Sequence, residues 1–234
     1  MAEEVVLMKG NEAIAHAAIR CGADGYFGYP ITPQSEVLET LAELKPWETT
    51  GMVVLQAESE VAAINMVYGG AGSGKMVLTS SSSPGVSLKQ EGISYMCANN
   101  YPAVLVNVQR WGAGLGTLDS SQTDYLRDTR CGGNGDCRVI VLTPNSIQET
   151  IDLMYIAFDL AEKYRNPVEI LTEAALGQMM EAVEFPEFKE RTEDLGWTWG
   201  GTNRDHGRLA NPDKPGATKA KYELITENEQ RYEA

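Results

Sequence analysis

The fold is decided around one stretch, Gln56-Ala57-Glu58-Ser59-Glu60-Val61-Ala62-Ala63-Ile64-Asn65-Met66-Val67-Tyr68-Gly69-Gly70. The preceding residues, 52–55, are apolar and numerous enough for a buried strand, and the Ala, Ile, Met and Val positions that follow are typical of a buried helix. Glu58 and Glu60 therefore stand where a strand ends and a helix begins. An unpaired carboxylate in apolar surroundings is costly, so we expect one of the two to have a functional role.

The wider chain alternates between strand and helix patterns. The predicted strands are residues 25–30, 52–55, 76–79, 103–108, 139–142 and 168–172, and helical patterns cover residues 9–21, 36–44, 60–70, 86–98, 120–129 and 147–163. This order predicts an α/β fold, with a doubly wound, largely parallel sheet of about six strands flanked by helices. Residues 1–186 are expected to form this domain. Residues 187–234 are expected to form an irregular arm that ends in a charged helix, 223–233.

Composition limits the classes of partner. A net charge of −14 and an isoelectric point near 4.6 argue against nucleic acids and anionic membranes, which both select clustered Lys and Arg. No apolar run approaches the ~20 residues of a membrane span, and Met1-Ala2-Glu3-Glu4 lacks the basic start of a secretory signal. We expect a cytoplasmic protein.

One motif imitates a nucleotide-binding loop. Gly69 and Gly74-Lys75 have the spacing of a P-loop, but Met76 replaces the magnesium-binding hydroxyl, and the order is helix–loop–strand instead of strand–loop–helix. We expect these glycines to end a helix.

The four cysteines are too few and too irregular for a disulfide framework. Cys131 and Cys137 are separated by five residues, which fits neither zinc nor iron–sulfur spacing. We expect no metal site in this chain. Cys21 and Cys97 lie in apolar helical patterns and are interpreted as packing residues.

Three polar loops follow predicted strands, at the edge where parallel sheets bind ligands. Thr32 lies between Pro30 and Pro33 on a stiffened backbone, and its alternative is a simple turn residue. The serines 80–83 precede a helix and would form an anion-friendly pocket floor, or merely a serine-rich connector. Arg110 ends a buried strand and is well placed to bind a carboxylate through two hydrogen bonds, although an ordinary surface arginine is the alternative.

Together these segments resemble the α subunit of a 2-oxoacid:ferredoxin oxidoreductase. The similarity spans residues 5–186 and rests on five motifs in family order: Met8-Lys9-Gly10-Asn11-Glu12-Ala13, Tyr29-Pro30-Ile31-Thr32-Pro33, residues 56–69, residues 80–88 and Val108-Gln109-Arg110. The serine run with Glu58-Ser59-Glu60 is most similar to the 2-oxoisovalerate (3-methyl-2-oxobutanoate, branched-chain) enzymes. The 2-oxoglutarate and pyruvate enzymes are the alternative.

The resemblance implies the pyrimidine-binding domain of a thiamine-diphosphate-binding fold. In such a domain Glu60 is the catalytic residue that binds and activates the cofactor, and Arg110 binds the substrate carboxylate beside Thr32. Ser80, Ser81, Ser82 and Ser83 are expected to line the same cavity, and Glu58 to lie near a subunit boundary.

The resemblance also implies partners and a reaction. Gly135-Asp136-Cys137 only imitates the diphosphate-and-magnesium signature, so a β subunit is expected to bind diphosphate and magnesium and to carry an iron–sulfur cluster. A γ subunit, with or without a δ subunit, would complete the complex. The expected reaction is oxidative decarboxylation of a 2-oxoacid to an acyl-CoA, with coenzyme A as co-substrate and ferredoxin as electron acceptor. A non-oxidative thiamine enzyme subunit and a non-catalytic scaffold remain alternatives.

Overall fold

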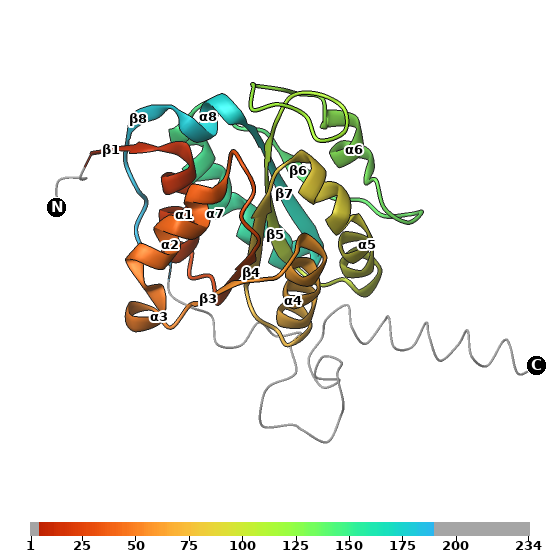
Figure 1. The fold of residues 1–234 in the computed structure, drawn as a ribbon. Helices are drawn as coiled ribbons and strands as arrows, with labels where there is room; N and C mark the ends of the chain where they lie inside the picture. The colour runs from red at the N-terminus through yellow and green to blue at the C-terminus, as the bar shows by residue number, and fades with distance from the viewer. Residues whose placement is uncertain (1–4, 190–234) are drawn as a thin grey trace, which may run out of the picture. The chain divides into compact units, whose positions relative to one another are not determined.

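The computed structural model describes residues 5–189, in which six parallel strands form the central sheet (Figure 1). The strands are β2 (Gly25–Gly28), β3 (Val53–Gln56), β4 (Val77–Ser81), β5 (Ala103–Gln109), β6 (Ile140–Leu142) and β7 (Pro167–Glu173), in the order β3-β2-β4-β5-β7-β6. All five neighbouring pairs are parallel. The predicted doubly wound sheet is confirmed.

Helices cover both faces of the sheet. The helices are α1 (Gly10–Arg20), α2 (Ser35–Leu44), α3 (Pro46–Thr49), α4 (Glu60–Gly72), α5 (Ser83–Asn99), α6 (Tyr125–Arg130), α7 (Ile147–Tyr164) and α8 (Ala174–Gln178). On β5, Val104 and Val106 belong to the same core cluster as residues of α1, α2 and α7, whereas Leu105 packs with residues of α4 and α5. Successive side chains of a strand point to opposite faces, so burial on both faces explains the continuous apolar runs of the sequence.

The sheet has a topological switch point at β2 and β4. The chain leaves β2 for β3 on one side and then returns to place β4 on the other side of β2. In open parallel sheets, ligands bind outside the carboxyl ends of the strands at such a point. The loop after β2, the serines at the end of β4 and Arg110 after β5 are all at this edge.

Strand β3 differs from the prediction of a buried strand. Val53 is 50% exposed and Leu55 is 42% exposed, because β3 is at the end of the strand order and pairs with β2 alone. An apolar run does not distinguish a central strand from an edge strand, since position in the sheet is set by topology.

Other differences are local. The helix predicted at 36–44 begins one residue earlier, at Ser35, and its N-cap is Gln34. The helix predicted at 120–129 is shorter in the structure, where it is α6, because residues 120–122 have no regular structure and residues 123–124 form a turn. The sequence did not predict the antiparallel pair of β1 (Val6–Lys9) and β8 (Met180–Val183), whose four-residue strands are too short for a clear pattern.

A disulfide joins Cys131 and Cys137, with the two Cα atoms 5.8 Å apart. The expectation of no disulfide framework missed this local link, because the residues between the cysteines fold back against α5, where Asn134 donates its backbone N–H to Ser94 Oγ. Cys97 Sγ lies 3.2 Å from Cys137 Sγ. Cys21 is buried in the core as predicted.

The prediction that Gly69 and Gly74 end a helix is half right: α4 continues through Gly69 to Gly72, and Gly74 follows its end with a positive φ of 82°. Among residues 5–189, no helix has the length and apolar character needed to cross a membrane. The described residues belong to one unit apart from Gly72–Gly74. The predicted helix 223–233 and nearly all of the predicted arm fall outside the described residues.

Candidate active site

Glu60 is the first residue of α4 and is only 7% exposed. Its carboxyl lies against the start of α5. A Cβ atom at position 85 would be 2.9 Å from both Cγ and Oε1 of Glu60, nearer than real Cβ contacts come. Glycine at position 85 is therefore what leaves space for the Glu60 carboxyl between the two helices.

Ser81, at the end of β4, and Ser82, which follows it, provide buried hydroxyls at this edge of the sheet. Both residues are almost completely buried, and within the described part of the chain neither Oγ atom has a hydrogen-bond partner. Ser81 Oγ borders the same Gly85 position as Glu60. A buried polar group without a partner costs on the order of 1–3 kcal/mol, so a polar ligand that satisfied these hydroxyls would be favoured here.

Arg110 and Thr32 are brought together although 78 residues separate them in the chain. The Arg110 side chain is 7% exposed; Nη1 donates to the Thr32 carbonyl at 2.8 Å and Nε to the Leu115 carbonyl at 2.9 Å. Ser83 Oγ accepts a hydrogen bond from the Arg110 backbone N–H at 3.0 Å, which ties the start of α5 to the end of β5. A guanidinium has five N–H donors, so further donors remain to bind an anion.

The loop that carries Thr32 is held on several sides. Gln34 Nε2 donates to the Tyr29 carbonyl at 3.2 Å, and the Pro33 carbonyl accepts from Asn11 Nδ2 at 2.6 Å and from Gln178 Nε2 at 3.0 Å. Thr32 itself is exposed at the sheet edge. The structure thus positions Thr32 rigidly beside Arg110.

Ser80 differs from the other three serines. It is fully buried, and its hydroxyl is hydrogen-bonded to Tyr26 Oη at 2.7 Å and to Gln34 Oε1. These bonds tie β4 to β2 and to the Thr32 loop. Ser80 therefore stabilises the elements that carry the site. Its role in binding substrate stays a prediction, as do the roles of Ser81, Ser82 and Ser83.

Glu58, the second carboxylate of the opening stretch, is exposed. The two glutamates are therefore distinguished by burial, with Glu60 inside and Glu58 outside. Burial of the carboxyl supports the assignment of the chemical role to Glu60.

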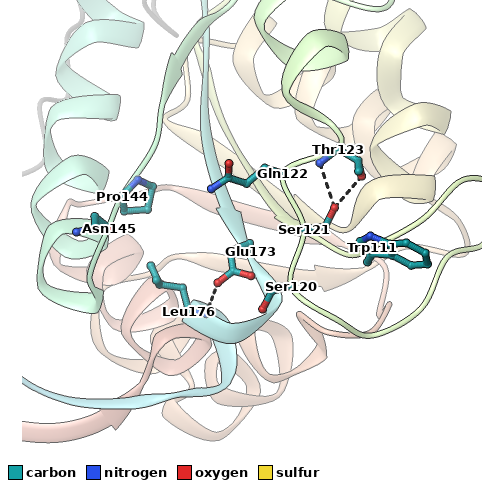
Figure 2. Close-up of a pocket in the computed structure, with 9 residues that line it drawn as sticks. All are labelled: Trp111, Ser120, Ser121, Gln122, Thr123, Pro144, Asn145, Glu173 and Leu176. Atoms are coloured by element: carbon teal, nitrogen blue, oxygen red, sulfur yellow. Dashed lines mark hydrogen bonds between the residues drawn. The ribbon is translucent and has the colours of Figure 1, made fainter.

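A cavity of about 680 Å³ lies at the carboxyl ends of β5 and β7. Figure 2 shows the nine residues that line it: Trp111, Ser120, Ser121, Gln122, Thr123, Pro144, Asn145, Glu173 and Leu176. Glu173 Oε1 accepts from the Leu176 backbone N–H at 3.2 Å, and Ser121 Oγ from the Thr123 N–H at 3.0 Å. None of the predicted site residues lines this cavity, although Trp111 directly follows Arg110.

Two residues at the site were not predicted. Gly85 and Lys89 both lie on α5, and Lys89 is 1% exposed. In the sequence, Ser87-Leu88-Lys89-Gln90-Glu91 has the appearance of an ordinary helix surface. The available signal was that Gly85, Lys89 and Ile93 are spaced by four residues and so share one helix face, together with the buried Ile93.

This arrangement is typical of one class of protein, the α/β enzyme domains that bind a polar cofactor and an anionic substrate at the switch point of a parallel sheet. Residues 16–234 match the family described as pyruvate flavodoxin/ferredoxin oxidoreductase, thiamine diP-binding. The chain belongs to this family, whose relatives are named as subunits of 2-oxoacid:ferredoxin oxidoreductases.

Two relatives and one solved structure illustrate the similarity. The ketoisovalerate oxidoreductase subunit VorB of Methanothermobacter marburgensis is 46% identical over 97% of this chain and 67% of its own length. The 2-oxoglutarate synthase subunit KorA of Methanothermobacter thermautotrophicus is 39% identical over 79% of this chain and 48% of its own length. The solved 2-oxoglutarate:ferredoxin oxidoreductase of Magnetococcus marinus, with 2-oxoglutarate, coenzyme A and succinyl-CoA bound, has 26% identity and a TM-score of 0.78, covering 96% of this chain and 43% of that one.

The residues present fit the pyrimidine half of a thiamine diphosphate site. An aminopyrimidine offers ring nitrogens and an amino group along its edge, and these match one buried carboxyl and two buried hydroxyls without partners. The space that Gly85 leaves at Glu60 allows a close approach. Among residues 5–189 no group of three or more His, Cys, Asp or Glu side chains is arranged to hold a metal ion.

Proposed function

We propose that this chain is the α subunit of a 2-oxoisovalerate:ferredoxin oxidoreductase and contributes the pyrimidine-binding half of its active site. The observation that supports this most directly is the convergence of buried Glu60, Ser81 and Ser82 with the Arg110–Thr32 pair at one edge of the sheet. The similarity to VorB, which is higher and longer than that to KorA, favours the branched-chain 2-oxoacid.

Each residue has a distinct task in the proposed mechanism. When bound, thiamine diphosphate supplies the nucleophilic carbon that attacks the 2-oxo group and accepts the electrons released with carbon dioxide. Glu60 holds the aminopyrimidine through a proton shared between its carboxyl and ring nitrogen N1′, at a position from which water is largely excluded. Arg110 binds the substrate carboxylate with its remaining N–H donors, and Thr32 orients the substrate beside it.

The proposal also assigns the rest of the reaction to partner chains. A β subunit would bind diphosphate and magnesium and carry an iron–sulfur cluster, while a γ subunit, with or without a δ subunit, would complete the complex that uses coenzyme A and ferredoxin. The coenzyme A in the Magnetococcus marinus structure supports the use of coenzyme A, and the relatives named as subunits support a complex of several chains.

The test is 2-oxoacid-dependent reduction of ferredoxin or viologen by the complex purified anaerobically through this chain, with coenzyme A and a panel of 2-oxoacids. We expect 2-oxoisovalerate to give the highest kcat/KM. Glu60→Gln should lower kcat by about 10²–10⁴-fold, as expected for loss of proton transfer, whereas the control variant Glu43→Gln should keep wild-type activity because Glu43 is an exposed residue of α2.

Three outcomes would overturn parts of the proposal. A preference for 2-oxoglutarate would keep the mechanism and replace the substrate, in agreement with KorA. Decarboxylation without reduction of ferredoxin would favour a non-oxidative thiamine enzyme. Full activity of Glu60→Gln would remove Glu60 from the mechanism.

A further inference from the structure

Lys89 is a buried lysine beneath the active site. The side chain is 1% exposed, and its Nζ atom donates to Thr79 Oγ1 at 2.7 Å and to the Ser80 carbonyl at 2.9 Å. An ammonium group has three N–H donors, so a third remains. Placing a lysine in a protein interior is costly, and lysine is almost never fully buried unless it is paired.

The helix geometry directs Lys89 towards Glu60. Gly85 and Lys89 are four residues apart on α5 and so lie on the same face, one turn apart. Side chains on a helix lean towards its N-terminus, which here is the turn containing Gly85. Glu60 Oε1 lies against Gly85, so Lys89 and the Glu60 carboxyl flank the same turn of α5, close enough to interact electrostatically although they form no ion pair.

Charges from several elements surround Lys89. Glu60 on α4 and Glu169 on β7 both favour the charged form of Lys89. Glu169 is itself completely buried, and it interacts with Asp128, Arg127 and Asp124 from the α6 region. Burial outweighs the two glutamates and lowers the pKa of Lys89 from 10.5 to about 7.

We propose that Lys89 is a positioning residue of the active site, whose ammonium, fixed by Thr79 and Ser80, favours through its charge the position of the Glu60 carboxyl beside Gly85, without a direct ion pair. The inference rests on the proposed function, since it assigns Glu60 to the aminopyrimidine. A lysine that only filled space between α5 and β4 would be replaceable by an apolar side chain of equal length without any effect on the site.

Lys89→Met, in the purified complex freed of cofactor, provides the test. Calorimetric titration with thiamine diphosphate and magnesium measures the dissociation constant between pH 6 and 9. In the wild type we expect affinity to fall on the order of tenfold above a midpoint near pH 7, as Lys89 loses its proton. Lys89→Met should bind about tenfold more weakly at pH 6 and lack this midpoint, while Lys163→Met on α7, an exposed helix lysine, should match the wild type.

Thr79→Val keeps the test decisive if Lys89→Met does not fold. This nearly isosteric change removes one acceptor of the ammonium. Because the charged form of Lys89 is then less stabilised, the midpoint of the pH dependence of cofactor affinity should move to lower pH. If the affinity for thiamine diphosphate keeps the wild-type pH dependence in both Lys89→Met and Thr79→Val, the role of Lys89 is overturned. The proposed function still holds in that case as long as Glu60→Gln is inactive. Unchanged affinity and activity in Glu60→Gln as well would overturn the proposed function itself.

Discussion

Gly85→Ala tests whether the Glu60 carboxyl must occupy the space beside α5. The added Cβ would lie 2.9 Å from Glu60 Cγ and Oε1 and would also meet Ser81 Oγ, whereas ordinary contacts begin at 3.4 Å. Glu60 therefore has to retreat by about 0.5 Å, the difference between these two distances. Catalytic groups need to be held within about 0.5 Å of their productive position, and misplacement by about 1 Å costs on the order of 10²-fold in rate. We expect kcat/KM for 2-oxoisovalerate to fall by about 10- to 100-fold.

Gly69→Ala is the matched control. Gly69 lies in α4, and a Cβ there meets no atom within 4 Å. Replacing an exposed helix glycine by alanine typically stabilises by up to about 1 kcal/mol, so this variant should unfold at a higher urea concentration and keep wild-type activity. Gly85→Ala should gain no stability, because overpacking costs about 1–3 kcal/mol and this cost offsets the gain from the higher helix propensity of alanine.

The assays are dye reduction by the reconstituted complex, calorimetric titration with thiamine diphosphate and urea unfolding of the full chain. If Gly85→Ala kept the cofactor affinity and kcat/KM of the wild type, Glu60 would not be the group that contacts the cofactor from this position, and the reasoning would be refuted. If Gly69→Ala also lost activity, the loss in Gly85→Ala would reflect the replacement of any helix glycine and not the displacement of Glu60.

Three further predictions concern neighbouring groups. Arg110→Ala should raise KM for 2-oxoacids by about 10- to 100-fold, because a hydrogen bond to a charged group contributes about 1.5–3 kcal/mol; an unchanged KM would exclude carboxylate binding by Arg110. Tyr26→Phe removes the bond to Ser80 and should lower the free energy of unfolding in urea by about 1 kcal/mol, and equal stability would show that this bond contributes nothing. Burial lowers the pKa of Lys89 from 10.5 to about 7. Between pH 7 and 10.5, Lys89 is therefore protonated in the unfolded chain and neutral in the folded chain, so the stability of the fold rises with pH across this range. The stability difference between wild type and Lys89→Met should therefore change by about 2–3 kcal/mol from pH 7 to 9, and a constant difference would contradict the buried, titrating lysine.

The sequence predicted the features that depend on local pattern. The alternation of apolar runs and helix periodicity yielded the parallel sheet, because each strand of β4, β5 and β7 is buried on both faces. The loops with Thr32 and Arg110 were predicted at the ligand-binding edge, since each follows a strand. Their direct hydrogen bond depends on the fold of the loop after β2, which no local pattern specifies.

The features that the sequence missed depend on tertiary position. The exposure of β3 follows from its place at the sheet edge. Lys89 was missed because burial of a helix lysine depends on which strands lie beneath it, and here these are β4 with Thr79 and β7 with Glu169. The distinction between Glu58 and Glu60 likewise arises from the packing of α4 against Gly85.

Buried polarity at the switch point supports a functional interpretation of this edge. Glu60, Ser81, Ser82, Lys89 and Arg110 are all less than 9% exposed, and the hydroxyls of Ser81 and Ser82 have no partner within residues 5–189. Apolar residues at these positions would avoid the cost of burying polar groups. Departures of this kind from favourable packing are expected where a site has to be ready for a ligand. A cofactor that hydrogen-bonds to Glu60 and these hydroxyls would therefore stabilise the folded chain, and its binding should raise the midpoint of unfolding of the assembled complex.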